Sequence, residues 1–376
     1  MEKTKVKEYF KSLPKRYFIT AFSGMAQGLF VTLIAGTILS QIAGWIGNNY
    51  IGNTLLYIAN IAKILMGAGI GVGIAHALGK NKLLVFSSAV AGMVGAWADQ
   101  LIVGGGGFLA ITGKMGAALP GNPIGAYVVT MLVVELVELY AGKTKLDIIL
   151  IPIGTLLLSF VGVFVAFPFI KLIDLFAMLL VITINAGAAV KIIVGVLIAV
   201  VMGVLLTMPT SSAAIWVAIA TSNTAIENPE VFAIAGGAAV AGCAAHMVGF
   251  AVASFKENGV SGLISQGIGT SMLQIPNIMK KPVIMLPEII SSAVAGLVAV
   301  LFNMRCTAAG GGMGTSGLVG LFGVIDANSS YAVEPILTVL GIVFCLFIIP
   351  AGITLLVSEF MRKKGWIKDG DMKLPD

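Results

Sequence analysis

Charged residues are scarce in this chain, and their scarcity excludes a soluble protein. Of the 376 residues, 11% are charged and 58% are hydrophobic, whereas soluble domains contain about 25% charged and about 45–50% apolar residues. Polar stretches outside the apolar runs reach only a few tens of residues, fewer than the roughly 50 that a folded domain needs. We therefore expect a membrane protein without an attached kinase, ATPase or other soluble catalytic domain.

Cysteine and histidine are also rare. Cys243, Cys306 and Cys345 show no CxxC spacing, and two of them lie in apolar runs. The pattern therefore favours neither a disulfide framework nor a metal site. The sequence contains no nucleophile and base at a workable spacing and no metal-ligand cluster. We predict no catalytic residue, no metal and no cofactor.

Long apolar runs occupy most of the chain and leave room for about ten spans of about 20 residues. The first run, at about 30 residues, is longer than the apolar region of a cleaved signal peptide, so we expect a retained span. The predicted fold is an all-α polytopic membrane protein with about ten transmembrane helices, in a single domain covering residues 1–376. The expected spans are 17–46, 55–78, 83–103, 124–141, 146–170, 188–206, 209–221, 231–254, 283–304 and 334–360.

Lysine and arginine are distributed unevenly between the two sides of these spans. If both termini are cytoplasmic, 18 of the 23 basic residues lie on the inner side and 4 on the outer side, as the positive-inside rule requires. The basic residues then report orientation and lipid contact rather than nucleic-acid binding. We expect a multi-pass membrane protein with a basic cytoplasmic segment at 1–16 and a cytoplasmic tail at 361–376.

Four stretches do not have the character of plain spans. The stretches 104–123 and 305–331 are rich in glycine, and 256–281 is semi-polar. Irregular backbone survives at membrane depth only where protein buries it or where it lines a wet cavity, so we expect re-entrant segments there. The run 209–221 is too short to cross the membrane and predicts a broken helix within the bundle.

A pentapeptide occurs twice in these irregular stretches. GIGTS at 267–271 recurs as GMGTS at 312–316, and a third Thr-Ser pair follows Pro209. Glycines let the backbone approach a ligand, and hydroxyls supply donors and acceptors without a charge to desolvate. The pattern suits a polyol, although helix packing by small residues is the alternative.

Amide side chains near the first copy favour binding over packing, because amides facing lipid are costly. We expect the Thr-Ser pairs of the two copies to approach one another at a shared cavity. The substrate-binding residues predicted from these segments are Thr210, Ser211, Thr270, Ser271, Gln274, Asn277, Thr315 and Ser316.

Two ionisable residues within spans complete the predicted site. His246 lies ten residues before Lys256, so on a helix it sits about 15 Å from the inner surface. An ionisable group at that depth marks either a functional site or a buried histidine bonded to a facing carbonyl. Glu288 could bond a substrate hydroxyl or pair with Lys280 or Lys281 at the interface, the ion pair being favoured.

Other motifs have structural interpretations. Glycines spaced four apart between Gly67 and Gly73 lie in an apolar run, where they favour close helix packing over a phosphate-binding loop. Glu135 and Glu138 share one helix face, and we expect them to pair with Lys143 and Lys145 rather than to relay protons.

Four segments together resemble a known family. They are SQGIGTSMLQIPNIMKKP at 265–282, GMGTSGLVG at 312–320, MPTSSAAI at 208–215 and AGCAAHMVGFAV at 241–252. Essentially the whole chain resembles the EIIC-type membrane subunits of the bacterial phosphoenolpyruvate-dependent sugar phosphotransferase system, in a branch described as EIIC or regulatory membrane proteins.

The resemblance implies ten spans with re-entrant hairpins, a location in the bacterial inner membrane, a homodimer, and sugar uptake coupled to phosphorylation by separate cytoplasmic subunits. Members of the family present a carboxylate and a histidine to the sugar, and the resemblance nominates Glu288 and His246 for these roles. Our first hypothesis is a permease that moves a small hydroxylated solute by alternating access. The second is a membrane sensor that binds such a ligand without transporting it.

Overall fold

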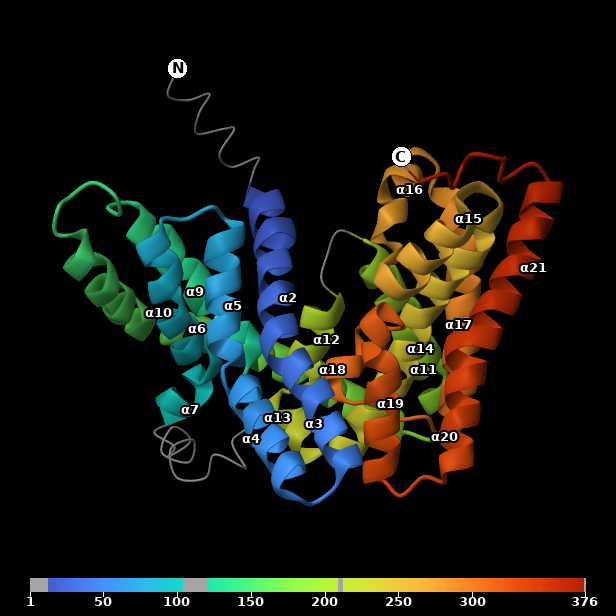
Figure 1. Cartoon of the computed structure of the whole chain (residues 1–376), viewed down its shortest axis with the longest axis horizontal. Helices are drawn as coiled ribbons and strands as arrows, with labels where there is room; N and C mark the ends of the chain where they lie inside the picture. Colours follow the sequence, from blue (N-terminus) through green and yellow to red (C-terminus); the bar gives the residue numbers. More distant parts are fainter. Residues whose placement is uncertain (1–12, 104–120, 209–211, 375–376) are drawn as a thin grey trace. The chain divides into compact units, whose positions relative to one another are not determined.

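The computed structural model describes residues 13–103, 121–208 and 212–374 (Figure 1). Helices are the only regular secondary structure in these ranges, which confirms the all-α polytopic class. The chain forms two compact units, unit 1 at Met1–Leu175 and unit 2 at Phe176–Asp376.

Unit 1 consists of apolar helices interrupted by π-helical turns (η1 and η2). Its helices are η1 (Arg16–Ala21), α2 (Phe22–Leu29), η2 (Phe30–Ile34), α3 (Ala35–Ile46), α4 (Tyr50–Ile64), α5 (Met66–Ala77), α6 (Lys82–Ala96), α7 (Ala98–Val103), α9 (Pro123–Glu138) and most of α10 (Asp147–Asn185). Asparagine side chains accept backbone N–H bonds at the starts of α4, α6 and α9, which satisfies donors that a helix leaves free at its N-terminus.

Glycine contacts bring α2, α5 and α6 together. A Cβ atom added at Gly71 would lie 1.9 Å from the Ser88 carbonyl oxygen, and one at Gly92 would lie 2.0 Å from the Gly67 carbonyl oxygen. On the other side of α5, a Cβ at Gly28 would lie 2.2 Å from the Gly69 carbonyl oxygen. The backbones touch without intervening side chains, which confirms the packing interpretation of the α5 glycines.

The prediction that Glu135 and Glu138 on α9 pair with Lys143 and Lys145 is wrong. Glu135 accepts from Arg16 Nε at 2.8 Å, and Glu138 pairs with Arg16 and with Lys80. Helix α9 ends at Glu138 and turns follow it, so neither lysine continues the helix face that carries the two glutamates. Lys143 instead donates to the Leu139 carbonyl oxygen.

Unit 2 contains the end of α10 and the remaining helices, several of them short. They are α11 (Ala188–Thr207), α12 (Ser212–Ala220), α13 (Asn223–Glu227), α14 (Pro229–Ala253), α15 (Phe255–Ile264), η3 (Ser265–Gly269), η4 (Ser271–Gln274), α16 (Ile275–Lys280), η5 (Pro282–Met285), α17 (Leu286–Leu301), α18 (Ala308–Gly311), η6 (Ser316–Leu318), α19 (Val319–Ser330), α20 (Pro335–Gly341), η7 (Ile342–Ile348) and α21 (Ile349–Lys363).

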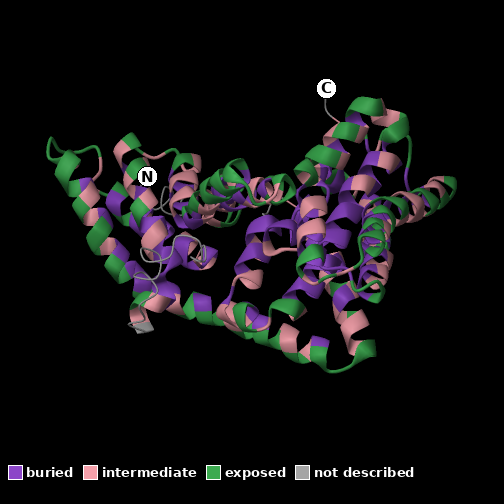
Figure 2. Ribbon diagram, turned by 60° about the horizontal axis from the view of Figure 1, so that its bottom comes forward, coloured by how far each residue is buried: buried purple, intermediate pink, exposed green. Residues whose placement is uncertain are grey.

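Helix α14 is the centre of unit 2. In its most apolar 18-residue window, 89% of the residues are buried, against 28% in α10. Its glycines let neighbours approach: a Cβ at Gly242 would lie 1.9 Å from the Ala199 carbonyl oxygen of α11. The helices around α14 keep large apolar side chains exposed, such as Ile193 on α11 and Leu356 on α21, and Figure 2 shows exposed residues along the outward faces of helices. Apolar faces of this extent suit contact with lipid.

Fewer helices of spanning length occur in the described residues than the ten spans expected. Among those residues, six helices are long and apolar enough to cross a membrane, and the pair α4 and α5, bent by 52°, gives a seventh if it forms one span. Three other expected spans correspond to the shorter helices α6, α9 and α12, of 15, 16 and 9 residues. The short α12 agrees with the broken helix expected at 209–221, whereas 104–120, most of one expected re-entrant stretch, lies outside the described residues.

We predict that Gly92→Ala destabilises the protein by about 1–3 kcal/mol, because the added methyl group forces α5 and α6 apart. Thermal melting of the purified protein in detergent measures the effect. Gly44→Ala in α3 is the matched control, since a Cβ there meets no atom within 4 Å, and alanine favours the helix. Equal melting temperatures for Gly92→Ala and the unmodified protein would refute the packing argument.

Candidate substrate site

Three polar side chains form a connected row inside unit 2. The Thr207 hydroxyl, at the end of α11, lies 2.8 Å from His246 Nδ1 on α14 and 2.9 Å from Ser271 Oγ at the start of η4. All three residues are fully buried. A hydroxyl carries one proton and two lone pairs, so Thr207 can bond both neighbours. This row fixes the imidazole through Nδ1 and leaves Nε2 for another partner.

A second group of polar atoms lies one turn along α14 from His246. Gly249 is three residues after His246, and a Cβ added there would lie 3.0 Å from Glu288 Cγ and 2.8 Å from Thr354 Oγ1. Glu288 is in the first turn of α17, where the helix dipole favours a negative charge. Thr354 is on α21, so three helices contribute to this group.

Four polar atoms of these two groups have no hydrogen-bond partner among the described residues. They are His246 Nε2, both carboxylate oxygens of Glu288, and Thr354 Oγ1. Each residue is 0% exposed. Buried polar groups without partners are rare and costly, and Glu288 and Thr354, which carry three of these four atoms, both lie beside Gly249.

The prediction that Glu288 forms an ion pair with Lys280 or Lys281 is wrong. Lys281 Nζ instead donates to Asp371 Oδ2 at 2.6 Å, and Glu288 lies buried between α14 and α21. Because α17 starts at Leu286, Glu288 belongs to its first turn and faces the helix bundle.

The two pentapeptides lie side by side. Thr315 Oγ1 donates to the Gly267 carbonyl oxygen at 2.5 Å, and Ser316 Oγ donates to the Gly269 carbonyl oxygen at 2.9 Å. The backbone is irregular at both copies, as expected, with Thr270 extended after η3. Gly314 has φ +55°, and a Cβ there would lie 2.7 Å from the Cys243 carbonyl carbon. The second copy therefore packs directly on α14.

The predicted amide ligands Gln274 and Asn277 do not bond to His246 or Glu288. Gln274 donates to Gln266 Oε1 at 2.8 Å and to the Met372 carbonyl oxygen at 2.9 Å. Asn277 donates to Gln274 Oε1 and to the Lys373 carbonyl oxygen. They are thus bonded to each other and to the segment after α21. Thr210 and Ser211 lie outside the described residues.

Sequence patterns missed Thr207, Ser292 and Thr354. Ser292 Oγ donates to the carbonyl oxygens of Glu288 and Gly242 and so ties α17 to α14. Isolated hydroxyl residues are ordinary in membrane helices, and no sequence signal distinguished these three.

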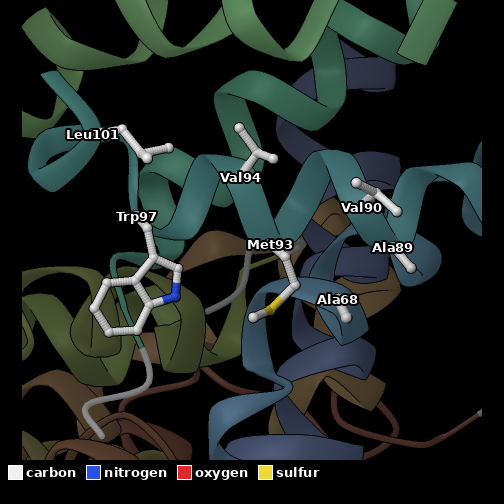
Figure 3. A pocket seen from close by; sticks show the side chains of 7 residues that line it. All are labelled: Ala68, Ala89, Val90, Met93, Val94, Trp97 and Leu101. Carbon is white, nitrogen blue, oxygen red and sulfur yellow. The ribbon is translucent and has the colours of Figure 1, made fainter. Parts of the chain in front are cut away.

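An apolar pocket of about 500 Å³ lies in unit 1 (Figure 3). Its lining is Ala68, Ala89, Val90, Met93, Val94, Trp97 and Leu101. Trp97 Nε1 is the one polar side-chain atom of that lining. A wall of this chemistry does not suit a polyol. Among the described residues, no group of three His, Cys, Asp or Glu side chains could hold a metal.

The fold and these polar groups define a class, the polytopic membrane proteins that enclose polar side chains within a helical bundle. Comparison with known families is more specific. The profile of the family described as "Phosphotransferase system, EIIC" matches residues 19–374, nearly the whole chain. The chain therefore belongs to the EIIC family, the membrane permease components of sugar phosphotransferase systems. No curated protein matches the chain, and no solved structure does.

We predict that Thr207→Val destabilises unit 2 by about 1–3 kcal/mol, because both His246 Nδ1 and Ser271 Oγ lose a buried partner. Thermal melting of the purified protein measures it. Thr37→Val is the control, since the Thr37 hydroxyl donates to the Leu33 carbonyl oxygen of its own helix. If Thr207→Val and Thr37→Val have the same melting temperature, the row from His246 to Ser271 does not stabilise unit 2.

Proposed function

We propose that the chain binds a sugar or related polyol at His246, Glu288 and Thr354 and translocates it across the membrane by alternating access. The observation that carries the proposal is the group of unpartnered polar atoms enclosed by α14, α17 and α21. Such atoms persist in a fold only where a compensating interaction or function exists. A solute rich in hydroxyl groups supplies the missing partners.

The chemistry of the group matches hydroxyl recognition. The Glu288 carboxylate offers two acceptor oxygens to neighbouring hydroxyl groups, and charge-assisted bonds of this kind are stronger than neutral ones. The imidazole, held through Nδ1 by Thr207, presents Nε2, and Thr354 adds a hydroxyl that both donates and accepts. Because Gly249 has no side chain, Glu288 and Thr354 can lie directly against the backbone of α14, which brings them together.

The broken segments at 265–271 and 312–318 support a transport role. Interrupted helices beside a polar site are common in transporters, where they let the backbone change its arrangement around a bound solute. We retain Thr270, Ser271, Thr315 and Ser316 as candidate contacts along the solute's path. Within the proposal, phosphate reaches the sugar from separate cytoplasmic phosphotransfer proteins. The homodimer and the cytoplasmic termini stay predictions.

We predict that Glu288→Gln and His246→Asn each weaken sugar binding by about tenfold to a hundredfold, the equivalent of one lost hydrogen bond to a charged group or more. Binding of a panel of hexoses, hexitols and disaccharides to the protein in detergent measures the effect. Glu334→Gln is the control, because Glu334 is an exposed carboxylate before α20. Unchanged affinity in both site variants would remove these residues from the site.

A transport assay in reconstituted vesicles distinguishes the permease hypothesis from the sensor hypothesis. With phosphoenolpyruvate and cytosolic extract inside, we expect uptake of the bound sugar in the unmodified protein and its loss in Glu288→Gln. Saturable binding without any flux would instead favour a ligand-binding sensor. If neither binding nor flux occurs with any sugar or polyol, the proposed function fails.

A further inference from the structure

The segment after α21 folds back over one end of unit 2. Figure 1 shows the chain leaving the top of α21 and crossing toward α16. Asn258 Nδ2 and Gln274 Nε2 both donate to the Met372 carbonyl oxygen at 2.9 Å, and Asn277 Nδ2 donates to the Lys373 carbonyl oxygen at 2.9 Å. Side-chain amides thus hold the segment largely through its backbone, as a groove holds a bound peptide.

Ion pairs and apolar burial add to these bonds. Lys281 pairs with Asp371 at 2.6 Å, and the Gly370 N–H donates to Glu257 Oε1 at 2.9 Å. Burial alone would raise the pKa of the Asp371 carboxyl, but the bonds from Lys281 and from the Lys368 backbone N–H lower it overall. The carboxyl therefore stays ionised at neutral pH. The Met372 side chain is fully buried in an apolar cluster.

The segment contacts the short helix in which the polar row from His246 ends. From His246 the contacts pass through Thr207 to Ser271, which opens the short helix η4. The same helix ends at Gln274, which binds the segment. A pocket of about 720 Å³ lies beside this end, and Lys373 and Leu374 of the segment form part of its wall. The segment therefore packs against the short helix in which the polar row ends, beside this pocket.

We propose that residues 365–374 are a latch, which must leave Gln274 and Asn277 before a solute bound at His246 and Glu288 can pass to this face. The proposal rests on the proposed function and adds its regulation. When the latch leaves, the amide donors that now bind the Met372 and Lys373 carbonyl oxygens become free for solute hydroxyls. The two amides predicted from the sequence to bind substrate would then do so during exit.

Hydrogen exchange of the intact protein in lipid nanodiscs measures latch release without reference to transport. The backbone N–H groups of Gly370 and Leu374 donate to Glu257 and Asn258, so they exchange slowly while the latch is docked. The variant Asp371→Asn with Met372→Ser removes the ion pair and the buried side chain, and we expect exchange about tenfold faster. Glu359→Gln is the control, since it removes an exposed ion pair with Lys256 that does not contact the latch.

Sugar uptake into vesicles by the same variants completes the test. We expect the double variant to take up sugar faster, by up to about tenfold, because uptake scales with the fraction of open protein, while Glu359→Gln matches the unmodified protein. Faster exchange with unchanged or slower uptake would overturn the latch and leave the proposed function standing. Unchanged exchange in the double variant would show that the segment does not detach, which also overturns it. If the unmodified protein neither binds nor takes up sugar, both proposals fail.

Discussion

The enclosure of α14 by protein is the constraint on which the rest of unit 2 depends. Hydrocarbon cannot form a hydrogen bond with a free N–H or C=O group. A segment whose helix is interrupted therefore needs a protein neighbour that excludes lipid and whose side chains are small enough to let the segment approach. A helix built largely of glycine and alanine meets both needs, because its neighbours reach its backbone. The turn at Gly314 lies directly against Cys243, and the ionisable His246 is enclosed by the same packing.

Much of this architecture follows from the sequence because its signals are local. Apolar runs gave the helices, and short or glycine-rich runs gave α12 and the irregular stretches around 265–271 and 312–318. The spacing of Gly67 to Gly73 gave the close packing of α5, since glycines four apart share a helix face: one pair meets α6 and the other meets α2. Helix lengths were harder to predict: α10 continues through Pro168 to Asn185, past Lys171 and Asp174, which form an i, i+3 ion pair on the helix.

The site was only partly predictable, because its partners come from distant parts of the chain. His246 and Glu288 were identified as charges within apolar runs, but the absence of an ion pair at Glu288 depends on where α17 begins. No local sequence signal marks Thr207 or Thr354, because their roles depend on the residues that they contact in the folded chain. The amides Gln274 and Asn277 were recognised as a polar cluster, yet their bonds to Met372 and Lys373 join residues about a hundred positions apart.

The contacts between the two pentapeptides have a mechanical consequence. Hydroxyls of the second copy bond the carbonyl oxygens that the break in the first copy leaves unpaired by helix. Displacing either copy alone would break both bonds, at a cost of about 0.5–1.5 kcal/mol for each. The two segments are therefore coupled, and a rearrangement of unit 2 keeps these bonds only if it moves both copies together.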